Sequence, residues 1–127
     1  MKKYLAAVLL VLVSTAAFAA AQEASAVTAN VPFAFLVGTK SFPAGMYEFT
    51  ASDNLGEIKV LNLKGRDAAI APVITRLSPK SEDEAAVVFD VAGADHYLSE
   101  IYVPGLDGFL VKGSPSKHTH VTVKGGK

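Results

Sequence analysis

The sequence predicts an all-β protein: a small sandwich or barrel of seven to eight mostly antiparallel strands, preceded in the precursor by a signal-peptide helix. Three observations predict this class. From Asn30 onward, apolar residues recur with a period of two in short segments. Turn-forming residues separate these segments, so that one strand follows another roughly every 8–15 residues. No window in this region carries the apolar stripe of a helix, which has a period of about 3.6 residues.

The start of the chain has the organisation of a secretory signal peptide. Lys2 and Lys3 form a basic start, the apolar run LAAVLLVLV follows, and small residues come next. An A-x-A cleavage site ends at either Ala19 or Ala21, so we expect cleavage after one of them. The apolar run is shorter than the roughly 20 residues of a spanning helix, so no membrane span is expected in the mature chain.

The chain is expected to hold a single domain, because its length of 127 residues is enough for one and not for two. Four segments are predicted: a signal peptide over residues 1–21, a flexible lead-in over 22–29, one β domain over 30–124 and a frayed tail over 125–127.

Charge and cysteine content exclude several classes of function. Removal of Lys2 and Lys3 leaves ten basic and twelve acidic side chains, a net charge of −2 with neutral histidines. Nucleic-acid binding is not expected, because it requires a basic surplus on one face. The absence of cysteine excludes disulfides, thiol chemistry and thiolate metal sites. The signal pattern places the mature protein in the periplasm or outside the cell.

The first strands are rich in aromatic residues at alternating positions. Residues 31–37 place Val31, Phe33, Phe35 and Val37 on one face, and two turns follow, at 38–40 and 43–45. We expect the aromatic side chains to meet as cross-strand neighbours in the core. The alternative is an exposed aromatic binding platform. The residues concerned are Phe33, Phe35, Phe42, Tyr47 and Phe49.

The middle strands contain two irregularities. In EIKVLNL, the phase of the apolar residues shifts after Val60, which indicates a bulge or a strand buried on both faces. The segment 68–75 is apolar on both faces but contains Pro72, which cannot donate to a neighbouring strand. An edge strand or a bulged strand is therefore expected there. The charged segment 76–84 reads as a solvated loop.

Four strands complete the domain, over 86–92, 96–103, 109–112 and 118–123. The first of them, AVVFDVA, is expected to direct Phe89 inward and Asp90 outward. The last, HTHVTV, places valines on one face and both His118 and His120 on the other.

Several stretches of the chain resemble a known family. VPFAFLVGTKSFPAG followed by Tyr47, then VVF, then YLSEIYVPG are similar to short exported proteins common in acidobacterial soil bacteria. Those proteins begin with VPFxF and PAGxY motifs and carry a later YFLSx(I/V)W stretch. The resemblance covers about residues 30–112 and implies export and a compact β domain, with no catalytic residues. The chain departs from the pattern at Tyr102, where the family has tryptophan, and in its C-terminal SPSKHTHVTV segment.

No catalytic constellation and no cofactor are predicted. His96 and Ser99 point to opposite faces of a strand, and the serine lacks the strained elbow of a nucleophile. His118 and His120 are weak candidates for a metal, because a closed site needs three or four ligands and the sequence places only His96 and carboxylates elsewhere. No metal is therefore expected.

The function predicted from these features is that of an exported, non-catalytic envelope or extracellular module with an interaction or structural role. Its partner is an unknown protein or envelope component, contacted through an open strand edge near Pro72 or a surface that includes His96, Tyr97 and Tyr102. The alternative is a carrier of a small apolar or sugar-like ligand, which requires an internal cavity of at least roughly 300 Å³. A hydrolase is a distant alternative. The sequence does not set the oligomeric state.

Overall fold

The computed structural model of the chain describes residues 26–79 and 84–126, and all regular structure in that part is β-strand. This confirms the predicted all-β class. The expected signal peptide, with cleavage at Ala19 or Ala21, lies outside the described residues. The strands are β1 (Ala26–Val31), β2 (Phe35–Val37), β3 (Lys40–Phe42), β4 (Gly45–Ala51), β5 (Glu57–Asn62), β6 (Ala68–Leu77), β7 (Ala85–Ala92), β8 (Asp95–Tyr102), β9 (Gly108–Val111) and β10 (Thr119–Gly125).

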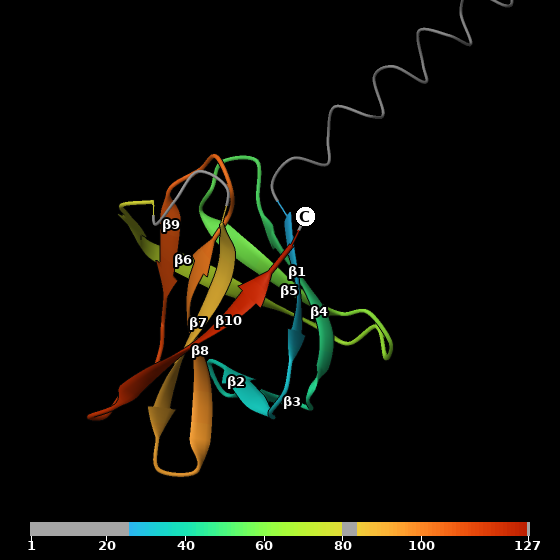
Figure 1. Cartoon of the computed structure of the whole chain (residues 1–127), viewed down its shortest axis with the longest axis vertical. Helices are drawn as coiled ribbons and strands as arrows, with labels where there is room; N and C mark the ends of the chain where they lie inside the picture. Colours follow the sequence, from blue (N-terminus) through green and yellow to red (C-terminus); the bar gives the residue numbers. More distant parts are fainter. Residues whose placement is uncertain (1–25, 80–83, 127) are drawn as a thin grey trace, which may run out of the picture.

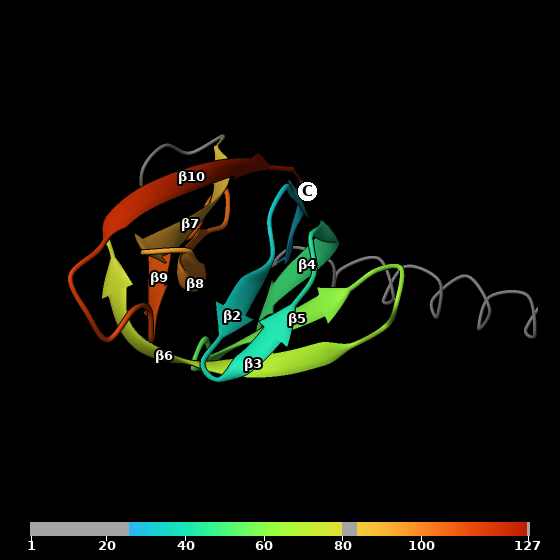
Figure 2. The same ribbon diagram turned by 90° about the horizontal axis from the view of Figure 1, so that it is seen from below.

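The strands form one open, mostly antiparallel sheet that folds over a single main core (Figure 1). Its order is β1-β4-β5-β6-β9-β8-β2-β3, and β7 pairs with both β8 and β10. Strand β6 belongs to both halves, because its first part pairs with β5 and its second part with β9. Figure 2 shows β6 curving from one half toward the other. The arrangement is that of a sandwich in which one long strand crosses between the two layers.

The two ends of the described chain meet. Thr28 of β1 and Gly126, just after β10, exchange two backbone hydrogen bonds of 2.7 and 2.8 Å. This isolated bridge does not extend into a ladder, so the sheet is not closed into a regular barrel. It does bring the C-terminal strand against the first one.

Both ends of the domain were predicted to be flexible, but their described residues belong to the sheet. Ala26 to Ala29 of the expected lead-in belong to β1, where Val27 and Ala29 are buried opposite Phe49 and Tyr47. The small side chains of this segment suggested flexibility, but here they pack beneath the large aromatic rings of the neighbouring strand. At the other end, Gly125 and Gly126 are held by β7 and β1, while 22–25 and Lys127 lie outside the described residues.

Strand β6 is bulged, as one of the two readings of Pro72 predicted, and each of its two parts pairs with a single strand. The register with β9 shifts between Val73 and Thr75. Pro72 faces β5 in register, and the next residue supplies the backbone donor, from Val73 N to Gly56 O at 2.9 Å. Residues 68–72 pair with β5 alone and residues 73–77 with β9 alone, so within the described part of the chain the side of Pro72 away from β5 has no partner strand. The predicted loop 76–84 also begins late, because β6 continues to Leu77 and residues 80–83 lie outside the described part.

The aromatic residues of the first strands form the centre of the core, as predicted. The rings of Phe35, Phe42, Tyr47 and Phe49 are at most 2% exposed. Phe35 lies 5.6 Å from Phe42, 4.8 Å from Tyr47 and 5.2 Å from Phe89, measured between ring centroids. Burial of such rings contributes roughly 1.5–3 kcal/mol each, which makes this cluster the main source of stability.

Tyr47 also carries a buried polar network, and its loss has a predictable cost. The hydroxyl donates to Pro43 O at 2.6 Å and accepts from Asn62 Nδ2 at 3.0 Å, and burial raises the pKa of Tyr47. Tyr47→Phe leaves the buried Asn62 amide without this partner, so we expect the free energy of unfolding to fall by about 1–3 kcal/mol. Urea denaturation measures the change. Tyr97→Phe is the control, with an expected change within about 0.5 kcal/mol; equal losses in the two variants would contradict the network.

Candidate metal centre

The three residues of the predicted binding surface, His96, Tyr97 and Tyr102, all lie on β8 but do not share a surface. His96 is half-buried and stacks on Phe33 with ring centroids 3.9 Å apart. Tyr97 is half-buried, and Tyr102 is only 8% exposed, next to Ala86 and Val88. The structure therefore does not offer Tyr102 as a contact surface.

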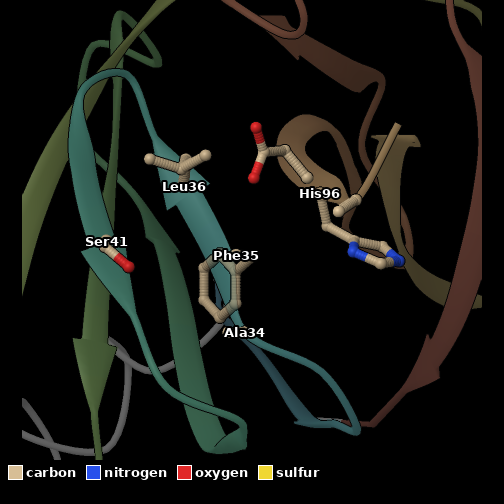
Figure 3. Close-up of a pocket in the computed structure, with 7 residues that line it drawn as sticks. Ala34, Phe35, Leu36, Ser41 and His96 are labelled. Atoms are coloured by element: carbon tan, nitrogen blue, oxygen red, sulfur yellow. The ribbon is translucent and has the colours of Figure 1, made fainter. Parts of the chain in front are cut away.

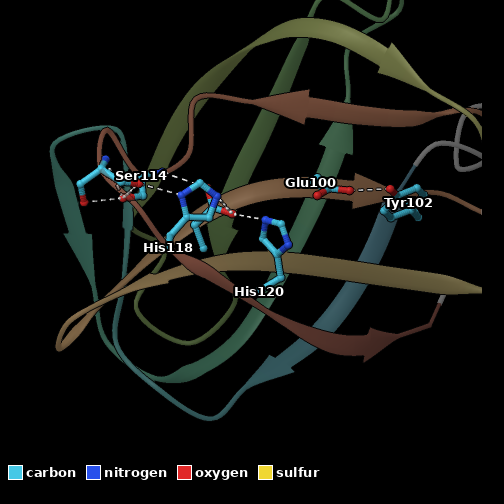
Figure 4. Close-up of polar contacts among 7 residues, drawn as sticks. Glu100, Tyr102, Ser114, His118 and His120 are labelled. Carbon is cyan, nitrogen blue, oxygen red and sulfur yellow. Dashed lines mark hydrogen bonds and ion pairs between the residues drawn. The ribbon is translucent and has the colours of Figure 1, made fainter.

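Tyr102 instead pairs with a neighbour on its own strand. Its hydroxyl donates a hydrogen bond to Glu100 Oε1 (Figure 4). Burial, with the hydrogen bond and the charge of Glu100, raises the pKa of Tyr102 to about 12. This hydroxyl is therefore neutral at physiological pH and acts as a donor rather than as a base.

Two pockets bear on the predicted ligand carrier. The first, beside His96, has a volume of about 90 Å³ and lies between β2, β3 and the start of β8 (Figure 3). It is too small for a ligand that needs roughly 300 Å³. The second, of about 390 Å³, is open to solvent and is lined mostly by exposed side chains such as Asp53, Lys59 and Ile70. Neither pocket is the internal cavity that a carrier requires.

A different group of side chains comes together where β7 pairs with β10. His120 of β10 lies opposite Asp90 of β7, and the loop before β10 brings His118 to the same place. Figure 4 shows the two imidazoles next to each other and away from the Glu100–Tyr102 pair. One oxygen or nitrogen atom from each of the three residues lies within 4.8 Å of the others. We call Asp90, His118 and His120 the Asp–His–His cluster.

Asp90 is buried, although it points away from the face occupied by Phe89. The predicted direction of Asp90 was correct, but the side chain is not exposed. The segment between β9 and β10 covers it and leaves it 3% exposed. Ser114 N donates to Asp90 Oδ2 at 2.9 Å. A Cβ atom on Gly113 would lie only 1.9 Å from the same oxygen, so the close approach of this segment requires glycine.

The other carboxylate oxygen of Asp90 faces the two imidazoles. Asp90 Oδ1 lies 3.2 Å from His120 Nε2 and 3.5 Å from His118 Nε2. Although this oxygen is fully buried, it has no hydrogen bond of acceptable geometry within the described part of the chain. A buried carboxylate oxygen without a donor costs free energy unless a positive charge compensates it.

These separations match the edges of a metal coordination polyhedron. Zinc–nitrogen and zinc–oxygen bonds of about 2.0–2.2 Å in a tetrahedral site place neighbouring ligand atoms about 3.3–3.5 Å apart. The two measured separations therefore need little adjustment to accommodate a small divalent cation.

The tautomer of His118 is set by its surroundings. His118 Nδ1 lies 2.8 Å from the backbone oxygen of Ser116. Because a carbonyl oxygen only accepts, the proton is on Nδ1, and neutral His118 presents the lone pair of Nε2 toward Asp90. A backbone carbonyl that accepts from one ring nitrogen while the other binds the ion is the usual arrangement around metal-ligating histidines.

The cluster can therefore exist in two chemical states. When Nε2 of both imidazoles is unprotonated, its lone pair faces Oδ1, and a cation between them would compensate the repulsion. Alternatively, one imidazole is protonated and forms an ion pair with Asp90, at the distances found here. An ion bound between the three side chains and a proton held between Asp90 and an imidazole are two ways to balance this buried carboxylate.

Sequence reasoning found the two histidines but missed their third partner. No local spacing joins Asp90 to His120, because they meet only through the pairing of β7 with β10. One signal was present: Asp90 interrupts an otherwise apolar strand, AVVFDVA, and an ionisable residue in such a position is usually paired.

No helix among residues 26–79 and 84–126 is long and apolar enough to cross a membrane. No family model, no curated protein and no solved structure matches the chain. The similarity of residues 30–112 to short exported acidobacterial proteins thus stays a prediction, and the functional conclusion depends on the geometry of the site.

Proposed function

We propose that this protein is an exported, non-catalytic β module that binds one divalent transition-metal ion through Asp90, His118 and His120. The observation that carries the proposal is the buried Asp90 Oδ1, which lacks a hydrogen bond within the described residues and lies 3.2 and 3.5 Å from two imidazole nitrogens. The signal-peptide pattern of residues 1–21 supports export to the periplasm or the exterior.

The donor set selects the class of ion. Two imidazoles and one carboxylate suit Zn²⁺, Cu²⁺ and Ni²⁺. Calcium and magnesium prefer a shell made of oxygen atoms, which this cluster does not provide. We therefore propose Zn²⁺ or Cu²⁺ as the ion bound, and Mg²⁺ and Ca²⁺ serve as negative controls.

The non-catalytic part of the proposal is supported by the placement of the residues considered for hydrolysis. Ser99 is 3% exposed, and His96 is stacked on Phe33. A buried serine cannot reach a substrate carbonyl, and this imidazole is engaged with an aromatic ring rather than with a nucleophile.

Calorimetric titration tests the proposal. We expect the purified, metal-free protein to bind one Zn²⁺ or Cu²⁺ per chain. Loss of an outer partner of a ligand already weakens metal binding by 10–100-fold, so His118→Ala and His120→Ala are each expected to weaken it by at least about 100-fold.

His96→Ala is the matched control, because it removes an imidazole outside the cluster and should leave the affinity unchanged. If the folded protein binds neither ion, the proposed function is wrong.

A further inference from the structure

Among the described residues, the Asp–His–His cluster brings together one ligand atom from each of three side chains. Asp90 Oδ2 is engaged by Ser114 N, which leaves Oδ1 as the single oxygen that Asp90 directs at the imidazoles. No fourth histidine, aspartate or glutamate joins the group in residues 26–79 and 84–126. A tetrahedral ion held by three protein donors keeps its fourth position for a water molecule or another ligand.

The burial of the three donors indicates where this fourth position points. The side chain of Asp90 is 4% exposed, that of His118 29% and that of His120 56%. An ion held by the three donors would therefore have the carboxylate on its buried side and the imidazoles on its more exposed sides. Its open position would then face solvent, where a ligand from another molecule could reach it.

The charge of the loaded site selects the ligand. One divalent ion with one carboxylate and two neutral imidazoles has a net charge of +1. Lys112 and Lys117 are both exposed, and Lys117 directly precedes His118 in the chain, so it adds a positive charge close to the cluster in sequence. A monodentate ligand with one negative charge neutralises this site, whereas a neutral or cationic ligand does not.

We infer that the metal ion of the Asp–His–His cluster has an open, solvent-facing coordination position that binds a carboxylate from another molecule. This inference rests on the proposed metal binding. It gives the envelope module a chemically defined partner: a free carboxylic acid, or a carboxylate on a polypeptide. The two sources share one ligand chemistry.

The test uses protein loaded with Co²⁺, whose visible absorption reports on coordination. Acetate and azide are each expected to change the spectrum in a saturable way, because either anion enters the open position. A spectrum unchanged by both anions would show a closed site and overturn the inference while leaving metal binding intact. Failure of Co²⁺, Zn²⁺ and Cu²⁺ to bind at all would instead refute the proposed function.

Two further arms identify the source of the carboxylate and the effect of the lysines. A short peptide with a free C-terminus is compared with its amide: competition with acetate by the acid form alone supports a polypeptide partner, and binding of acetate alone supports a small acid.

Lys117→Met is expected to weaken acetate binding by about twofold to fivefold, the range typical of exposed charge pairs. Lys64→Met, in the turn after β5, is the control and should have no effect. Equal affinities in all three proteins would refute the contribution of Lys117.

Discussion

Phe89→Ala is expected to lower the free energy of unfolding by about 3–5 kcal/mol, the range for deletion of a large buried ring. Phe89 is fully buried, and its ring packs edge-on against Phe33 at 5.0 Å and against Phe35 at 5.2 Å. It lies on β7, which pairs with both β8 and β10. Alanine there leaves a cavity at the contact between the aromatic cluster and the half of the sheet that carries the Asp–His–His cluster.

Urea or thermal denaturation measures this loss, and Ile74→Ala supplies the control. Ile74 is 62% exposed on β6, so its truncation should change the free energy of unfolding by no more than about 0.5 kcal/mol. A loss below about 1 kcal/mol for Phe89→Ala would contradict the packing described here.

Zinc is expected to raise the melting temperature by roughly 10–20 °C at a concentration 100-fold above its dissociation constant. A ligand that binds only the native state adds about 2.7 kcal/mol at that concentration. Each kcal/mol corresponds to about 4–8 °C in a domain of this size. The native state alone assembles the site, because Asp90 and His120 meet only when β10 pairs with β7.

Circular dichroism melts with zinc and with a chelator measure the shift. His120→Ala should melt at the same temperature in both conditions, whereas His96→Ala should keep the zinc-dependent increase. Asp90→Asn tests the contribution of the negative charge, because it keeps the shape of the side chain and the contact with Ser114 but removes the charge. A zinc shift that persists in the double variant His118→Ala/His120→Ala would show that the ion binds elsewhere.

Binding of the proposed ion would also stabilise β10, a strand with few buried side chains. Most side chains of β10 are exposed, so the strand depends on its backbone pairing with β7 and on the bridge from Gly126 to Thr28. An ion bound between Asp90 and His120 would add a cross-link at the opposite end of β10. In a chain without cysteine, such a link would supply the kind of cross-link that a disulfide supplies elsewhere.

The sequence by itself determined the all-β class and the composition of the aromatic core. Both depend on local information: alternation shows which side chains share a face, and a glycine in a turn position permits the reversal. Gly38, for example, has a φ of 62° between β2 and β3, at the turn predicted for 38–40. Phe35 and Phe42 then face each other across that hairpin, as expected for neighbours in sequence.

The tertiary structure alone decided which distant strands pair, and with them the candidate site. Period-two alternation assigns Asp90 to one face of β7, but it contains no information about the strand or segment that covers that face. Pairing with β10, and the close approach of Gly113, bury the carboxylate and bring both histidines to it. For the same reason Ala26 to Ala29 proved part of the sheet. Local patterns report orientation, whereas burial and electrostatic pairing arise only from contacts between segments that are far apart in the chain.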